Sequence, residues 1–550
     1  MRGLFVLLTA SLLATPLFAQ TDSVIVTGRI RNLSARLYRD APTVLIARNN
    51  ILQASRELVR PAPLAVDGSF RVAVPLIYPQ EELYFNYGRI STAFLAVPGT
   101  VTIDLNADSL FTTSVPFQFG GVNARINQEY ARYKAFEATY TGTPKPEALS
   151  TAISGPVTVR SFTTLTDAYG KALAAFRQRQ PLLPLTDRWL GSVNTYNAAA
   201  FFYDRLIYGG GEEPDALGDQ LRPASDPLLT GARAIAMNRF ATYATQTINE
   251  DAALQRGAGL SVQKLAQLLL RFSPRLSEAE RQRLNEFSTR NEARNSDLRF
   301  FDGLVKRSND TIQRLINYDL LIQRATTKFD TPSVNYLTAY WLATSLPALT
   351  IRQANVLYAY ARPRITESAL GQSLDELYRL ETGDSTAVWA ANSRLAKAGP
   401  SVAELEVSPG VFVTRNAGAS GQGLFDQVVN ANRGKLIYVL LTTPDTEAGR
   451  QAALDAQRLR DAYSARDMAL IYLPDTSTNP ALWPELATRN KLEGDHLLLT
   501  GDQLADVASR LRSGDGVSGT LISRVGKIIK RNAPLPGAFE EAKRLIDRNL

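Results

Sequence analysis

The first part of the chain, up to about residue 120, shows apolar and polar residues in short alternating runs. Between about 20 and 120 such runs, of which 69–74 is one, are separated by turn signals such as Asp67-Gly68. Alternation is typical of half-buried strands, because successive side chains point to opposite faces of a sheet. We therefore expect residues 20–120 to form an N-terminal antiparallel β sandwich or small barrel.

The period changes to about 3.6 residues over 121–404, which is typical of amphipathic helices. Ser277 and Glu280 have the spacing of a capping box at a helix start. Tyr340 and Trp341 could form a ligand platform, but aromatic residues at helical spacing more often pack in a core. The pattern predicts an α-helical middle region.

The pattern changes again over 405–550. Residues 436–441 and 468–473 are continuous apolar runs, typical of strands that are buried on both faces, and a helical pattern lies between them. This β-α-β order implies two parallel strands with a right-handed crossover. Two further strands and a last helix are expected over 519–548. The order of elements is the thioredoxin-like arrangement, so we expect an α/β thioredoxin-like domain and a multidomain chain.

The amino terminus has the pattern of a secretory signal peptide. Residues 1–19 carry one positive charge at Arg2, a short apolar run and a small residue, Ala19, at the expected cut. We expect cleavage after Ala19 and export of the mature chain to the periplasm. No later window supplies about 18 consecutive apolar residues, so no transmembrane span is expected in the mature chain.

Composition narrows the possible chemistry. The 550 residues contain no cysteine and one histidine, which excludes thiolate nucleophiles, iron–sulfur clusters and multi-histidine metal sites. Phosphate-binding and calcium-binding loop motifs are also absent. We therefore predict no metal and no cofactor. The net charge of +8 is spread along the chain without a basic block, so nucleic acid is not expected as a partner.

Several short motifs resemble those of a known family. Gly434-Lys435 precedes the first buried run, Trp483 lies in the helix expected after the second, and Gly526-Lys527 is placed to form a hairpin turn. With these motifs the chain resembles the exported thioredoxin-like thiol-disulfide oxidoreductases of the TlpA-like, Bacteroidetes type, which have an N-terminal β domain. The resemblance implies a redox-active Cys-x-x-Cys at the start of the helix after the first strand.

This chain departs from the family at that motif. The four aligned positions are Thr446, Glu447, Ala448 and Gly449. Asp445 takes the place of the family's tryptophan, and Gly519 takes the place of its cis-proline. Dithiol exchange needs a thiolate and a second, resolving thiol, and this chain has neither. We therefore expect a degenerate, redox-inactive member with no catalytic residues at this site.

The sequence supports two hypotheses on function. The first is a non-catalytic binding, scaffold or holdase-like role in the cell envelope, with proteins or peptides as partners on the thioredoxin-like surface. The alternative is an enzyme of another class, for example a hydrolase that uses carboxylates or His496 in an interdomain pocket. A polar cleft with convergent carboxylates away from 445–449 would favour this alternative.

Overall fold

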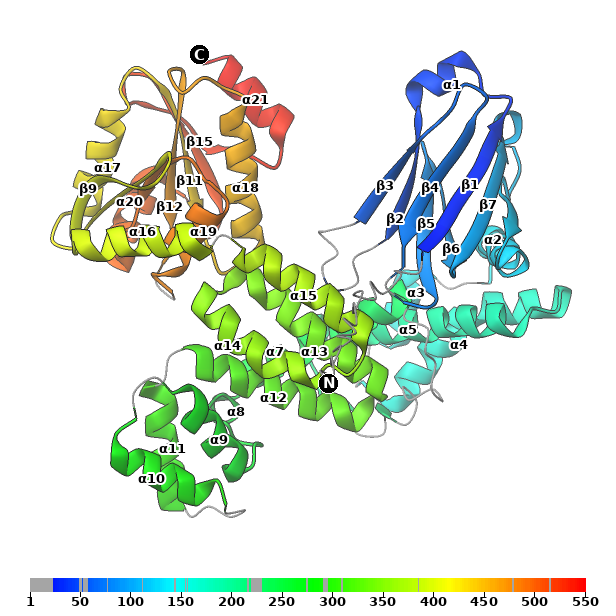
Figure 1. Ribbon diagram of the computed structural model, residues 1–550, viewed down its shortest axis with the longest axis horizontal. Helices are drawn as coiled ribbons and strands as arrows, with labels where there is room; N and C mark the ends of the chain where they lie inside the picture. Colours follow the sequence, from blue (N-terminus) through cyan, green and yellow to red (C-terminus); the bar gives the residue numbers. More distant parts are fainter. Residues whose placement is uncertain are drawn as a thin grey trace, which may run out of the picture.

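The computed structural model consists of three parts: a β sandwich, a helical region and an α/β part (Figure 1). The expected signal peptide over 1–19, with its cut after Ala19, lies outside the described residues. The coarse prediction of a β region, a helical middle and a C-terminal sheet region is confirmed. The structure describes residues 23–48, 52, 58–76, 78–110, 112–142, 145–153, 155, 157–214, 217–218, 230–273, 276–289, 295–307, 310–383, 385–476, 479–513 and 516–550.

Two four-stranded sheets pack face to face in the N-terminal part, in the strand orders β4-β1-β7-β8 and β3-β2-β5-β6. Inward-facing residues of both sheets, such as Val26 and Phe85, share one buried core, so the domain is a sandwich. Its elements are β1 (Ser23–Arg31), α1 (Ala35–Asp40), β2 (Thr43–Arg48), β3 (Leu58–Pro63), β4 (Ser69–Pro75), β5 (Glu81–Tyr87), β6 (Ile90–Ala96), β7 (Gly99–Asn106) and β8 (Gln118–Gly121).

One strand pair differs from the antiparallel arrangement that we expected. β1 runs parallel to β7, with Val26 opposite Val101. After β6 the chain passes Pro98 and crosses to the other sheet, so β7 lies beside β1 and not beside β6. The alternation of apolar residues predicts strands, but it carries no information about strand direction.

The middle part is helical, as predicted, and most of its helices share one apolar core. Ser277 and Glu280 form the expected capping box at the start of α10. No helix in the described part of the chain has both the length and the apolarity needed to cross a membrane. The helices are α2 (Ala124–Thr139), α3 (Pro146–Ala152), α4 (Val159–Arg179), α5 (Pro184–Gly209), α7 (Gly231–Glu250), α8 (Ala252–Gln255), α9 (Val262–Phe272), α10 (Glu278–Phe287), α11 (Asn295–Arg307), α12 (Asp310–Lys328), α13 (Thr331–Ser345), α14 (Ile351–Ala361), α15 (Ser368–Thr382) and α16 (Ser385–Ala398).

The C-terminal part is built on a seven-stranded sheet in the order β15-β14-β11-β12-β13-β10-β9. β11 and β12 are parallel, as the β-α-β pattern predicts, and β14 runs antiparallel to β11. The elements are β9 (Ser401–Ser408), β10 (Val411–Asn416), α17 (Gly421–Ala431), β11 (Leu436–Thr442), α18 (Glu447–Asp461), β12 (Met468–Pro474), α19 (Leu482–Arg489), β13 (Gly494–Leu497), α20 (Gly501–Leu511), β14 (Ser518–Ile522), β15 (Ile528–Ala533) and α21 (Phe539–Asp547).

Helices cover both faces of this sheet. Tyr438 and Leu440 of β11 pack with α18, α19 and α21, whereas Ile437 and Val439 pack with α17 and α20. Successive side chains of β11 point to opposite faces, and both faces are apolar. This explains why the sequence of the strand is a continuous apolar run.

Packing places the start of the C-terminal part earlier than the expected boundary at 405. β9 begins at Ser401, and Ala391 and Leu395 of the preceding α16 are buried in the core of the C-terminal sheet. Figure 1 shows α16 lying along the lower edge of this part. The helical period of α16 predicts an apolar face, but it does not indicate which neighbour that face contacts.

Candidate functional site

The start of α18, where the family resemblance would place a dithiol, is a capped helix terminus. Thr446 is the N-cap residue: its Oγ1 accepts the Gly449 N–H at 3.0 Å and donates to the Thr443 carbonyl at 2.9 Å. Glu447 and Ala448 are exposed, and Gly449 is buried. A side-chain oxygen at this position satisfies a backbone N–H that the helix itself leaves unpaired.

Gly449 is in close contact with the end of β11. A Cβ at this position would lie 2.0 Å from the Thr443 carbonyl oxygen. The hydroxyl of Thr442 also donates to the Gly449 carbonyl, at 2.7 Å. The turn therefore has no room for a side chain at the position that matches the second cysteine of the family motif.

Gly519, at the position matched to the family's cis-proline, lies in β14, where the pairing with β15 shifts register between Gly519 and Thr520. It pairs with Leu440 of β11, which places it at the same edge of the sheet as the start of α18. A Cβ here would lie 2.2 Å from the hydroxyl oxygen of Tyr438, which donates to the Pro534 carbonyl at 2.8 Å. No peptide bond in the described residues is cis. The tyrosine thus occupies the space above Gly519.

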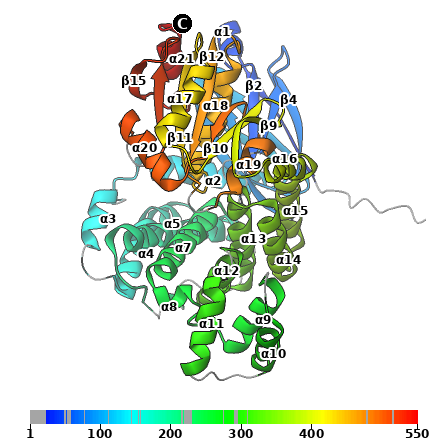
Figure 2. The same cartoon turned by 90° about the vertical axis from the view of Figure 1, so that its left-hand side faces the viewer.

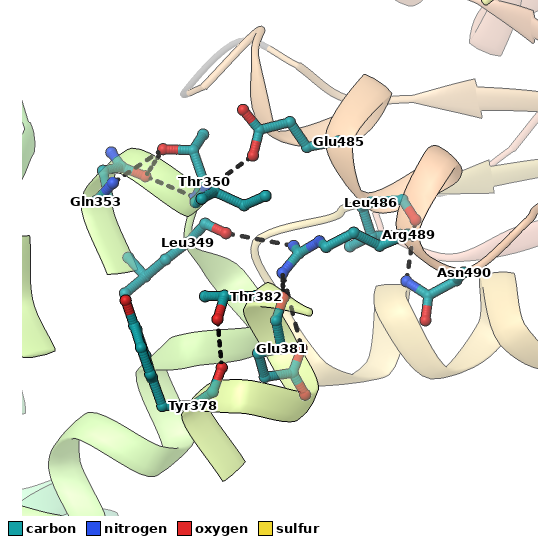
Figure 3. Close-up of polar contacts among 11 residues, drawn as sticks. Leu349, Thr350, Gln353, Tyr378, Glu381, Thr382, Glu485, Leu486, Arg489 and Asn490 are labelled. Atoms are coloured by element: carbon teal, nitrogen blue, oxygen red, sulfur yellow. Dashed lines mark hydrogen bonds and ion pairs between the residues drawn. The ribbon is translucent and has the colours of Figure 1, made fainter. Parts of the chain in front are cut away.

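The next helix, α19, attaches this part of the chain to the helical region (Figure 3). The buried Glu485 carboxylate accepts the backbone N–H of Ile351, at the start of α14, at 2.8 Å. Its other oxygen accepts from the side-chain amide of Asn392, on α16, at 3.1 Å. A carboxylate at a helix N-terminus is favourable because the helix dipole is positive there.

Arg489, one turn further along α19, reaches two other helix ends. Its guanidinium donates to the carbonyl of Leu349 at 3.3 Å and to that of Glu381, near the end of α15, at 3.1 Å. Only 8% of its side chain is exposed, and the carboxylate of Glu381 lies 3.7 Å away. At the end of α15 a cation has the charge that the helix dipole favours. The two ends of α19 are thereby fixed on the helical region.

These contacts place the start of α18 over a cavity of about 390 Å³ between the two parts. Leu52, from the connection between β2 and β3, also reaches it. Of residues 445–449, Glu447 lines the cavity. The polar side chains that line it include Asn238, Tyr340, Glu381, Glu447, Arg450 and Arg489.

Two arginines of this cavity are poorly solvated. Burial lowers the pKa of Arg450, an effect that Glu447 opposes, and burial lowers the pKa of Arg489, an effect that Glu381 opposes. Both groups remain cationic at neutral pH, because a guanidinium is hardly ever deprotonated in proteins. The Nε atom of Arg489 is buried and has no hydrogen-bond partner in the described residues.

His496, the histidine that the hydrolase hypothesis would use, is buried in the C-terminal core. Its Nδ1 accepts the indole N–H of Trp483 at 3.0 Å, and its Nε2 lies 2.9 Å from the Leu492 carbonyl. The ring stacks on Tyr472 with centroids 4.7 Å apart. Both ring nitrogens are engaged inside the domain, and His496 does not line the cavity between the two parts, so its contacts are those of a structural core residue.

The His496→Gln variant tests this structural role through pH. Burial lowers the pKa of His496 from 6.5 to about 4. The unfolded chain therefore binds the proton first, and stability is lost as pH falls below about 6.5. We expect wild-type stability to fall by about 1 kcal/mol per pH unit between about pH 6 and pH 5, and the variant to be much flatter. Urea unfolding at several pH values measures this, and equal slopes would contradict it.

Sequence reasoning singled out Thr446, Gly449 and Gly519, but it missed Glu485 and Arg489. Their i, i+4 spacing is a signal that usually indicates a surface ion pair on one helix. Here the two side chains reach different helix ends in another part of the chain. Their burial between two parts is not visible in the local sequence.

Comparisons with known proteins add little to this geometry. The chain matches no protein-family profile and no curated protein. Among solved structures it is similar to a solution structure from Bacteroides vulgatus, described provisionally as a thiol-disulfide oxidoreductase. The identity is 21%, the TM-score is 0.19, and the match covers 21% of this chain and 78% of the other. The functional interpretation of this chain therefore rests on its strand order and on its side-chain contacts.

Proposed function

We propose that this protein is an exported cell-envelope protein whose C-terminal part is a thioredoxin-like domain without redox activity. Its role is to bind other proteins or peptides as a scaffold or holdase. The element order β11-α18-β12 followed by β14-β15-α21 supports the fold assignment. The absence of cysteine from the chain supports the loss of activity, because exchange needs two thiols.

One observation carries the proposal. At the helix start where the oxidoreductases that it resembles have a dithiol, this chain has a closed, capped turn that adjoins a cavity of about 390 Å³. The turn is incompatible with thiol chemistry, whereas the cavity retains polar and apolar surface for a ligand. Binding without catalysis is the function that fits both features.

The pure full-length chain is expected to give no signal in insulin reduction with dithiothreitol as electron donor, beyond the rate of dithiothreitol alone. The physical reason is that no residue can form the mixed disulfide. Turbidity of the insulin B chain measures the rate. An active thioredoxin serves as the positive control, and turnover by this chain would overturn the proposal.

The binding half of the proposal needs a separate measurement. Light scattering of a heat-unfolded, cysteine-free test protein should fall when the chain is added at equal molar ratio. An unrelated protein of similar charge is the control for crowding and ionic effects. Aggregation that proceeds unchanged would count against a holdase and leave only a scaffold with a specific partner.

A further inference from the structure

A second hollow continues the cavity along the helical region. It has a volume of about 550 Å³ and lies between α7 and α13. Tyr340 and Thr344 line both hollows, so the two adjoin, and we call them together the junction groove. Figure 2 shows α7 and α13 side by side below the C-terminal part.

The cavity end of the junction groove carries one guanidinium with free donors, that of Arg450. Arg450 uses one terminal nitrogen for the carbonyls of Pro444 and Asp445, at 3.2 and 2.9 Å. Within the described residues it has no carboxylate within 4.0 Å. The Nε of Arg489 also has no partner there, but it is buried, so a ligand in the cavity does not reach it. Unused donors of a planar guanidinium suit a carboxylate, which accepts two parallel hydrogen bonds.

The remaining charges favour a single carboxylate over a phosphate. Glu381 and Glu447 line the same cavity and would repel a doubly charged anion more strongly than a singly charged one. Arg489 is already close to Glu381, at 3.7 Å. Arg450 is therefore the cation most available to an incoming ligand.

The other end of the groove suits a polypeptide chain. Thr245, Gln246 and Asn249 offer hydroxyl and amide groups that can pair with backbone N–H and C=O groups. Tyr340 and Trp341 are half-buried and add aromatic surface for side chains. Glu250 also lines this end, so the groove is acidic here and cationic at Arg450. Hydrogen-bonding groups and rings that lead to one guanidinium match a peptide that ends in its carboxylate.

We propose that the junction groove binds the carboxyl-terminal end of a polypeptide, with the terminal carboxylate on the guanidinium of Arg450. The preceding residues lie over Tyr340 toward Trp341. This inference rests on the proposed binding function and specifies its ligand. It concerns the surface between the helical region and α18, where the cavity faces the former dithiol position.

Calorimetric titration of the full chain with two peptides tests the proposal. The probes are N-acetyl-alanyl-alanyl-phenylalanine as the free acid and as the carboxamide. We expect the acid to bind at least about tenfold more tightly, because only the acid makes charged hydrogen bonds to Arg450. Equal affinities, or binding of neither probe, would overturn the proposal. If acetate binds as tightly as the free-acid peptide, the rest of the peptide contributes no affinity, and the proposal of a peptide ligand is wrong.

Variants on α18 locate the contact. Arg450→Gln should lower the affinity for the free-acid peptide by about tenfold and leave the affinity for the carboxamide peptide unchanged. Arg458→Gln, on the exposed side of the same helix, is the matched control and should bind like wild type. Glu447→Gln removes a negative charge that repels the carboxylate, so the affinity for the free-acid peptide should rise by about threefold. Loss of affinity in Arg458→Gln equal to that in Arg450→Gln would place the carboxylate elsewhere.

The comparison of acid and amide uses the wild-type chain, so it does not depend on the folding of Arg450→Gln. If neither peptide binds, the absence of reductase activity is unaffected, and the proposed function would stand with another ligand. Reductase turnover would overturn the proposed function whichever peptide binds. The two failures are therefore distinguishable.

Discussion

Gly449→Cys is expected to lower the free energy of unfolding by about 3 kcal/mol, although cysteine is the residue that the oxidoreductases it resembles have there. The new Cβ would lie 2.0 Å from the Thr443 carbonyl oxygen, so the start of α18 or the end of β11 must move. The hydrogen bond from the Thr442 hydroxyl to the Gly449 carbonyl would also be distorted. Urea unfolding followed by circular dichroism measures the change.

Two neighbours of this variant separate its steric effect from thiol chemistry. Gly449→Ala should lose about as much stability as Gly449→Cys, because both add a Cβ. Thr446→Cys should lose only about 1 kcal/mol, the usual value of an N-cap hydrogen bond. The double variant Thr446→Cys/Gly449→Cys should not reduce insulin. A Gly449→Cys protein as stable as wild type would show that the turn is not closed as described.

Glu485→Ala is expected to cost about 3 kcal/mol, since it removes a buried charge that serves two partners. The N–H of Ile351 and the amide of Asn392 would both lose their acceptor, in a place that water reaches poorly. Arg489 would also lose a neighbouring negative charge, which lowers the stability further. Thermal and urea unfolding of the full chain give the loss.

Glu540→Ala is the matched control for Glu485→Ala. Glu540 also lies in the first turn of a helix, α21, but it is exposed. An exposed acidic side chain at a helix start contributes only about 0.5 kcal/mol. Similar losses in the two variants would mean that the contact between α19 and α14 contributes no more than an ordinary helix dipole.

The parts of the fold that depend on local periodicity could be predicted from the sequence. The apolar runs that became β11 and β12, and the capping box at Ser277, depend on residues a few positions apart. The direction of β7 and the neighbour of α16 depend on how distant segments meet. Neither can be read from the local sequence, because the pattern shows that a face is apolar but not which segment packs against it.

The candidate site likewise has some features that the local sequence indicates and others that depend on distant contacts. Thr446 is of a residue type favoured at helix N-caps, and in the structure it caps α18. The close contact at Gly449 is not visible, since many glycines lie in open space. The contact between Glu485 and Ile351 joins residues 134 positions apart, so no local pattern in the sequence indicates it.

The packing of α16 determines how the C-terminal part can be cut out of the chain. A fragment that begins at 405 would lack α16 and the first half of β9. Leu395 and Ala391 would be missing from its core, and apolar side chains of α19 would be exposed to water. A fragment that begins at Ser385 keeps this helix and its sheet together. The fragment that can be excised is thus longer than the α/β region predicted from the sequence, because it includes α16, which the sequence pattern assigns to the helical region.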